Sequence, residues 1–584
     1  MTRRFALSVL LLAAICPYFV GLGSSSIWDA NEAFYVETPR EMLQRGDYVF
    51  PTFNYEPRLN KPVLSYWIVA AFYKVSGVSV FAERLAIALG GMVLIATAFF
   101  LAAAASPYSR PGGAPPAPGD IVFGASTRDR ATFAGLWAAI GLAVDPRLVM
   151  FARRIFIDIY ISMFMGLTLL FFALSERFPE RRRLFLLLMY ASVGLGVLTK
   201  GPIAAALPGL VFAIYLVVHR DLRRVRGMMI PTGTLVVLAI VVPWYAALYA
   251  RDGWTYIVSF FWGENFGRYT AGVGVDQSRG VEFYLPVLFS DSFPWSIFLF
   301  ASAACWLADR RNPAVRAEPG FRVRTLLWLW IVTIVVFFSF SRSKQDLYIF
   351  PVVPAVAALA GAFIVRAEHG LERRWRTVLR ATAVSIAALL AAAGVGVLYV
   401  FYSAGSVYAL DGAPLVGAVA VAGGIAAAVI GITGRARLAL FTVATALVAM
   451  QWTFVLRVLP SFERYKPVPA LTAVLERQQL SPEDAIAHFE VDLPSMVYYL
   501  RRHIDMYFEV QPFLEAMRVN RRVFAVISAE DYAALRDHIG VPTCVLHSQP
   551  TMNVKLKAMI AREPLPEILL ISNRCTADGL VTPR

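Results

Sequence analysis

The sequence predicts a polytopic α-helical membrane protein with about 13 transmembrane helices and a small C-terminal α/β domain. Composition supports this class: of the 584 residues, 58% are hydrophobic and only 16% are charged. Soluble globular proteins of this length rarely combine these values. Long apolar runs recur through residues 1–457, whereas residues 458–584 have the composition of a soluble domain.

The apolar runs define the predicted spans. A hydrocarbon core about 30 Å thick takes roughly 20 residues at 1.5 Å each, so each run of about 18 or more is a candidate. Residues 5–23 fit a retained first helix better than a secretory signal, because no Ala-x-Ala-like cleavage site is obvious before Trp28. The runs lie near residues 5–23, 82–105, 131–146, 150–174, 184–199, 202–218, 228–250, 283–307, 324–340, 346–365, 378–402, 413–432 and 437–457.

Arginine placement predicts the orientation. The net charge is +15, but its arginine clusters lie between apolar runs, a pattern typical of membrane topology rather than of nucleic-acid binding. With the N-terminus in the cytosol, every loop then expected to be cytosolic contains arginine, from Arg3 and Arg4 to Arg435 and Arg437. An odd number of spans places the C-terminal region outside. We therefore expect a plasma (inner) membrane protein with a periplasmic tail.

Two regions outside the membrane are large. The first external loop, residues 24–81, belongs to the predicted transmembrane domain 1–457 and contains amphipathic patterns at Asn31–Gln44 and Pro62–Tyr73, which predict helices lying on the membrane surface. The second region is the predicted periplasmic domain, residues 458–584. Its short apolar runs alternate with helical patterns, which favours an α/β domain with a sheet. The runs are Ala485–Phe489, Ile504–Phe508, Val523–Ile527, Thr543–His547 and Glu567–Ile571.

Cysteine and histidine residues give weaker signals. An oxidising periplasm permits a Cys544–Cys575 disulfide, which the sequence alone does not establish. The six histidines fall in predicted cytosolic loops or in the tail, so a histidine-containing zinc site at the membrane face is not expected. A divalent cation held by carboxylates and water stays compatible with the sequence.

Charged residues at the ends of apolar spans are candidates for function, because desolvating them is costly. They collect on the predicted outer face, where carboxylates can act as general bases and Lys or Arg can bind phosphate oxygens. A lipid phosphate fits such a site. Asp29 and Glu32 share a face if their segment is helical; alternatively, Asp29 only caps the following helix. The principal candidates are Asp29, Glu32, Lys61, Asp158, Lys200, Glu264, Arg268, Arg342 and Lys344.

Several motifs resemble the bacterial 4-amino-4-deoxy-L-arabinose transferases and related protein O-mannosyltransferase-like glycosyltransferases. The first external loop supplies the strongest matches. These are Trp28 to Tyr35, Arg40 to Leu43, Gly46-Asp47-Tyr48 and Asn60 to Trp67. Similar motifs follow along nearly the whole chain, namely Asp158, Thr199 to Pro202, Phe261 to Tyr269, Phe293-Pro294-Trp295, Ser341 to Lys344 with Tyr348 and Pro351, and Asp492 to Leu500.

This resemblance implies a GT-C fold and an inverting glycosyltransferase. The donor would be a polyprenyl-phosphate sugar, and the acceptor an envelope lipid such as lipid A, a glycan or a protein. By residue matching, Asp29, Glu32 and Asp158 become the candidate catalytic residues. The phosphate-binding candidates are Lys61, Lys200, Lys344 and Arg342, and the substrate-binding candidates are Tyr35, Tyr348, Glu264 and Arg268.

Departures from the family pattern affect the details. Many members have an adjacent Asp-Glu pair where this chain has Asn31-Glu32, so the base is either Asp29 or Glu32. Asn60 and Asn265 occupy positions that hold zinc ligands in the lipid A-modifying subgroup, which argues against zinc and against 4-amino-arabinose as the donor sugar.

A lipid-linked sugar or solute transporter is the alternative function. A transporter predicts charges along a path at mid-bilayer instead of at one face of the membrane.

Overall fold

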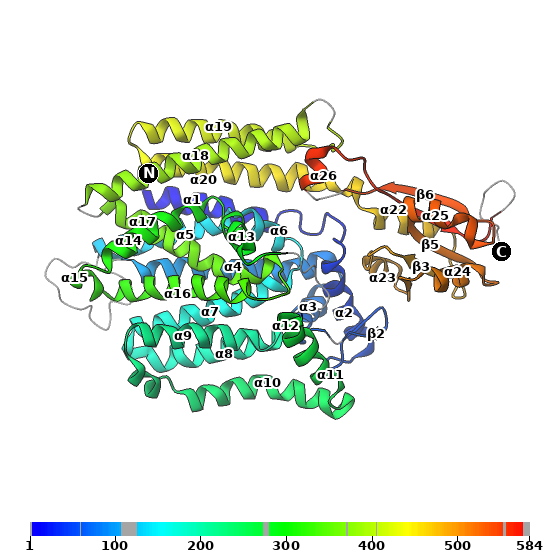
Figure 1. The fold of residues 1–584 in the computed structure, drawn as a ribbon, viewed down its shortest axis with the longest axis horizontal. Helices are drawn as coiled ribbons and strands as arrows, with labels where there is room; N and C mark the ends of the chain where they lie inside the picture. Colours follow the sequence, from blue (N-terminus) through cyan, green and yellow to red (C-terminus); the bar gives the residue numbers. More distant parts are fainter. Residues whose placement is uncertain are drawn as a thin grey trace.

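The computed structural model describes residues 3–58, 60–106, 125–271, 279–369, 372–403, 406–552 and 556–575. The molecule is elongated. A bundle of long helices forms one end, a domain with a β-sheet forms the other, and the first external loop lies between them (Figure 1). This arrangement places the loop where the bundle and the tail meet.

Nine helices in the described part of the chain are long and apolar enough to cross a membrane. The chain is an integral membrane protein. These helices are α4 (Val80–Ala105), α7 (Ile157–Arg177), α8 (Arg182–Lys200), α10 (Ile230–Asp252), α16 (Pro319–Ser339), α17 (Val353–His369), α18 (Arg373–Tyr402), α19 (Ala413–Ile432) and α20 (Ala436–Thr453).

Each of the 13 predicted runs coincides with a helix, but four of them fall outside this group. Three correspond to α1 (Arg3–Ile15), α5 (Ala125–Ala143) and α9 (Ile203–Val218). The fourth is divided between α13 (Tyr284–Asp291) and α14 (Phe298–Asp309), with a bend of 117°. The pair qualifies as a tenth span only if it counts as one broken helix. Thirteen crossings therefore remains a prediction.

Helix burial separates the centre of the bundle from its edges. The span that includes α17 is 94% buried, whereas α10 is 17% buried and α18 is 22% buried. An apolar helix that is buried on every side belongs to the core, and one that leaves its apolar surface open is expected to face lipid. Accordingly, α10 forms one edge of the bundle and α18 and α19 the opposite edge (Figure 1).

Glycines allow α18 and α19 to pack closely. A Cβ atom on Gly394 would lie 2.7 Å from the carbonyl oxygen of Gly417, and one on Gly424 would lie 2.6 Å from that of Ala387. Lipid supplies no hydrophobic force between helices, so such close backbone packing stabilises the pair.

The first external loop folds into two helices joined by a short hairpin. Helix α2 (Asn31–Arg45) and helix α3 (Leu64–Ser76) match the predicted patterns, and strands β1 (Thr52–Phe53) and β2 (Glu56–Pro57) pair antiparallel between them. Ten of the 15 residues of α2 are buried. Helix α3 and the tail cover α2, so α2 packs against protein on most of its surface, and its place at the membrane surface stays a prediction.

The tail contains a five-stranded mixed sheet whose strands coincide with the five predicted runs. The order is β4-β3-β5-β7-β6, with β3 parallel to both β4 and β5 and with β7 antiparallel to β5 and β6. Cys544 and Cys575 form a disulfide. The strands are β3 (Ala485–Phe489), β4 (Asp505–Tyr507), β5 (Val523–Ser528), β6 (Cys544–Pro550) and β7 (Glu567–Ser572), and the helices are α22 (Pro467–Arg477), α23 (Ser495–Leu500), α24 (Val510–Arg518), α25 (Ala529–Ile539) and α26 (Leu556–Ala561).

Short helical segments complete the described chain. The π-helical segment Ser259–Gly267 contributes Phe260, Phe261 and Trp262 to the lining of the cavity described below. The others are α6 (Pro146–Phe151), α11 (Thr255–Val258), α12 (Arg268–Ala271), α15 (Pro313–Arg316) and α21 (Leu459–Ser461).

Candidate active site

A cavity of about 1040 Å³ lies where the bundle meets the first external loop. It brings together four candidate residues that are far apart in the sequence, namely Lys61, Asp158, Lys200 and Lys344. The candidates Tyr35 and Tyr348 line it as well. The geometric expectation that distant charged residues share one cavity is met for these residues.

Helix ends position two of the charged residues. Asp158 lies in the first turn of α7, where the helix dipole stabilises a negative charge. Lys200 is the last residue of α8, and Gly201 ends that helix at a φ of +99°, a value that favours glycine. Their side chains form an ion pair. The Lys200 Nζ atom also lies 5.4 Å from the centre of the Tyr348 ring, so these three residues form one wall.

Lys344 is a buried cation without a carboxylate partner. Its side chain is 6% exposed, and Nζ donates a hydrogen bond of 2.6 Å to the carbonyl oxygen of Ser341. Among the described residues, no carboxylate lies within ion-pair distance of it. A desolvated ammonium group without a counter-ion is unfavourable, and a bound anion would compensate it.

The cavity as a whole is positively charged. Its lining has five cationic and two anionic side chains, a formal excess of three positive charges among the described residues. The two carboxylates are already paired, Asp158 with Lys200 and Asp346 with Arg147. The cations are Arg58, Lys61, Lys200, Arg279 and Lys344. This field favours a ligand with a phosphate group.

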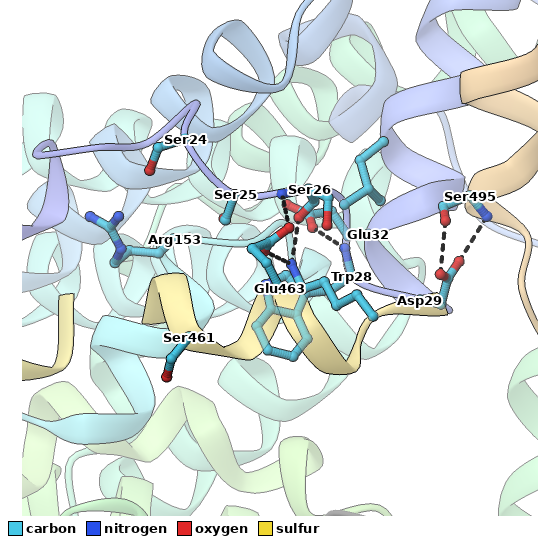
Figure 2. A network of polar contacts seen from close by, with 12 residues as sticks. Ser24, Ser25, Ser26, Trp28, Asp29, Glu32, Arg153, Ser461, Glu463 and Ser495 are labelled. Carbon is cyan, nitrogen blue, oxygen red and sulfur yellow. Dashed lines mark hydrogen bonds and ion pairs between the residues drawn. The ribbon is translucent and has the colours of Figure 1, made fainter. Parts of the chain in front are cut away.

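Asp29 does not line the cavity, and its carboxylate is held by the tail. It accepts hydrogen bonds from the backbone N–H of Ser495 at 2.7 Å and from the Ser495 hydroxyl at 2.8 Å (Figure 2). Burial raises the pKa of Asp29 from its ordinary value of 3.8 to about 7, although the Ser495 hydrogen bonds act in the opposite direction. Asp29 does not cap α2 either, since the residue before that helix is Ala30 and no side chain caps it.

Glu32 forms a buried ion pair. Its carboxylate accepts hydrogen bonds from Arg84 Nε at 2.7 Å and Nη2 at 3.0 Å, and from the backbone N–H of Trp28 at 2.6 Å. Both residues of the pair are 1% exposed. Asp29 and Glu32 therefore do not form a carboxylate pair in the cavity, because each has a separate partner. Asn31, between them in the sequence, is the residue that lines the cavity.

The remaining candidates fall into two groups. Arg342 is exposed and absent from the cavity lining; its backbone N–H donates to the carbonyl oxygen of Tyr269. The side chains of Glu264 and Arg268 lie outside the described part of the structure.

Sequence reasoning missed two cations of the lining. The Arg58 guanidinium lies 3.7 Å from the centre of the Phe34 ring, and Arg279 donates a hydrogen bond of 3.1 Å to the carbonyl oxygen of Lys344. Arg58 lies three residues before Lys61, and this closeness to a recognised motif was the only indication in the sequence that Arg58 belongs to the site. Arg279 had none.

Comparison with solved structures identifies the fold. The structure of ArnT from Cupriavidus metallidurans bound to undecaprenyl phosphate superposes with a TM-score of 0.74, at 23% sequence identity and over 100% of both chains. The chain therefore has the same fold as this ArnT. The apo structure of the same ArnT gives a TM-score of 0.73, at 22% identity and over 99% of both chains.

Sequence comparison also finds relatives, which are named as arabinosyl transferases. The chain is 28% identical over 404 residues to an undecaprenyl phosphate-alpha-4-amino-4-deoxy-L-arabinose arabinosyl transferase of Pseudomonas fluorescens (strain Pf0-1), and 30% identical over 380 residues to one of Pseudomonas aeruginosa (strain LESB58). The matches cover 68% and 63% of this chain but only 64% and 61% of those relatives. The family model for dolichyl-phosphate-mannose-protein mannosyltransferases matches residues 126–246.

A zinc site does not fit the residues that the structure describes at this cavity. Among the residues that the structure describes, no three His, Cys, Asp or Glu side chains lie close enough to hold a metal ion. Asn60 lines the cavity with a neutral amide, which is a weak ligand for zinc. We therefore derive no step through a metal.

Proposed function

We propose that this protein is an inverting glycosyltransferase that moves a sugar from a polyprenyl-phosphate donor to an envelope acceptor at the outer face of the plasma membrane. The buried Lys344, which has no carboxylate partner in the described part of the chain and lies in a positively charged cavity, carries this proposal. Lys344, Lys200 and Lys61 would hold the donor phosphate, and Tyr35 and Tyr348 would line the sugar site. The relatives' names, which specify undecaprenyl phosphate and arabinosyl transfer, support this class of donor.

Residues 1–457 would form the catalytic membrane domain, with thirteen crossings and the N-terminus in the cytosol. Residues 458–584 would then form a periplasmic domain. The Cys544–Cys575 disulfide supports this orientation, because disulfides persist mainly in oxidising compartments.

Asp158 is the carboxylate that we assign to the chemical step. Asp29 and Glu32 are held outside the cavity by Ser495 and Arg84 respectively, whereas Asp158, which is paired with Lys200, lines the cavity. In the transfer, an acceptor oxygen bonds to C1 of the sugar from the face opposite the phosphate, and the bond from C1 to the phosphate oxygen breaks. The electron pair leaves with the polyprenyl phosphate, where the lysines stabilise the added charge. Asp158 accepts the proton of an acceptor hydroxyl.

The test uses the full chain in lipid nanodiscs with a radiolabelled polyprenyl-phosphate sugar and envelope extract as the source of acceptor. We expect Lys344→Ala and Asp158→Asn each to lower the rate of product formation by about 10²–10³-fold. Lys557→Ala, an exposed lysine on the tail, serves as the matched control and is expected to keep wild-type turnover.

Wild-type turnover in both site variants would refute these assignments. Movement of intact lipid-linked sugar across the bilayer, without any glycosylated product, would instead support a transporter.

A further inference from the structure

A second cavity of about 440 Å³ adjoins the large one. Three side chains, Phe34, Arg58 and Asn60, line both, so a ligand in either cavity contacts the same wall. The outer boundary of the second cavity comes from the β1–β2 hairpin and from the tail, which contributes Asp492 and Met506. This volume lies within the range of small-molecule sites, about 300–1,000 Å³.

Hydrogen bonds to the tail hold the hairpin side of the second cavity in place. The Asn54 side chain donates to the carbonyl oxygen of Ile504 at 2.8 Å and accepts from the Ile504 N–H at 2.9 Å. The Tyr55 hydroxyl donates to the carbonyl oxygen of Arg501 at 2.9 Å. These bonds join the hairpin tip to the segment before β4, so the cavity exists only when loop and tail are docked.

The charge of the second cavity is opposite to that of the first. Its lining contains the carboxylates of Glu56 and Asp492 and one cation, Arg58, which gives a formal charge of minus one. Among the described residues, neither carboxylate has a cation within ion-pair distance. A phosphate bound here would meet a net negative charge, which disfavours it.

The polar atoms of this lining match hydroxyl groups. Carboxylates accept strong hydrogen bonds from hydroxyls, and the Oδ1 atom of Asn60 is buried with no partner among the described residues. Phe34 and Phe53 add an aromatic surface, their rings 4.8 Å apart. A sugar presents both complementary features, since its hydroxyls donate hydrogen bonds and its C–H faces pack on aromatic rings.

We propose that the second cavity binds the acceptor of the transfer, and that the acceptor is a neutral sugar of a glycan that reacts through a hydroxyl group. This inference rests on the proposed function and adds the class of acceptor to it. Glu56 and Asp492 are the residues that determine specificity, because they bind hydroxyls and reject phosphates. Asp158, across the shared wall, is then the group that takes the hydroxyl proton.

The experiment measures binding of three sets of probes to the full chain in nanodiscs by saturation-transfer NMR. The probes are neutral disaccharides, the same disaccharides with a phosphate monoester, and neutral peptides that contain Ser and Thr. Undecaprenyl phosphate is present at saturation so that the large cavity is blocked to phosphates. We expect the neutral disaccharides to bind at least about tenfold more tightly than either other set.

Variants assign the binding to the second cavity. Glu56→Gln combined with Asp492→Asn is expected to weaken disaccharide binding by about tenfold and to reduce the discrimination against phosphate. Glu515→Gln, an exposed carboxylate on α24, is the matched control and is expected to change neither value.

Stronger binding of the phosphorylated sugars or of the peptides would overturn the inference, as would unchanged disaccharide binding in the double variant or no disaccharide binding at all. Affinity for undecaprenyl phosphate is measured separately for each protein. If wild type and the double variant bind it equally, failure of the acceptor inference leaves the proposed function intact; if wild type does not bind it, the proposed function itself fails.

Discussion

At the scale of single residues, Lys344 illustrates how stability and function oppose each other in this site. Its ammonium group is buried with no counter-ion among the residues that the structure describes, an arrangement that destabilises the protein until an anion binds. We expect Lys344→Met to preserve or raise the melting temperature while it lowers turnover by about 10²-fold or more. Thermal unfolding and the transfer assay on one preparation check this. A large fall in melting temperature would contradict the account.

Glu32 is expected to act on stability alone. Glu32→Gln leaves the guanidinium of Arg84 buried without its charge partner, and breaking a buried pair in this way costs about 3–5 kcal/mol. Glu372→Gln disrupts an exposed pair with Arg374 and is expected to cost less than about 1 kcal/mol. Denaturant titration measures both. Wild-type stability of Glu32→Gln together with lost turnover would show that Glu32 is catalytic.

Asp29 gives a prediction about pH. A carboxyl group whose pKa is raised on folding binds its proton more tightly in the folded state. The stability it contributes is complete below its ordinary pKa of 3.8 and is lost as the pH rises through its folded pKa of about 7. We therefore expect wild type to lose stability relative to Asp29→Asn between about pH 4 and pH 7, with no further change above about pH 8. Melting temperatures across this range provide the measurement; parallel profiles would exclude a raised pKa.

These residues also show the limits of sequence reasoning. The motifs identified Lys61, Asp158, Lys200 and Lys344 as charged residues near span ends, and the structure brings them to one cavity. The partners of Asp29 and Glu32 were not predictable, since Ser495 and Arg84 lie 466 and 52 residues away. A carboxylate looks catalytic in a sequence until the residue that neutralises or binds it is known.

At the scale of elements, local patterns were enough to predict where helices and strands form. Apolar runs located every long helix, because hydropathy over about 20 residues decides membrane insertion. The strands of the tail followed from short apolar runs in the same way. The burial of α2 was missed, because its cover comes from α3 and α23, and nothing local to α2 encodes that contact.

The contact between hairpin and tail gives a prediction at this scale. Asn54→Ala removes both hydrogen bonds to Ile504, each worth about 1 kcal/mol, and Asn54 also has a φ of +57°, which alanine tolerates poorly. We expect faster hydrogen exchange in β1, β2 and β4, with no change in α17 at the bundle centre. Asn520→Ala, at an exposed site on the tail, is the control. Uniformly faster exchange would mean that the bundle, and not the contact, had been destabilised.

At the scale of the whole molecule, two adjoining cavities of opposite formal charge share the side chains of Phe34, Arg58 and Asn60. The large cavity is positive and belongs to the bundle and the first external loop, whereas the second cavity is negative and is completed by the tail. If the second cavity binds the acceptor as proposed, the tail forms part of the acceptor site. Composition could not reveal the site, because the net charge of +15 is distributed along the chain. The positive and the negative cavity form only when the chain folds.

The central claim is that the large cavity holds the phosphate of a lipid donor. The most direct test is an experimental structure of the full chain in nanodiscs with undecaprenyl phosphate. The account predicts phosphate density within hydrogen-bond reach of the Lys344 Nζ atom, about 3 Å, with the isoprenoid chain extending from the cavity into lipid. Phosphate density in the second cavity, or among the arginine clusters at the opposite end of the bundle, would contradict it.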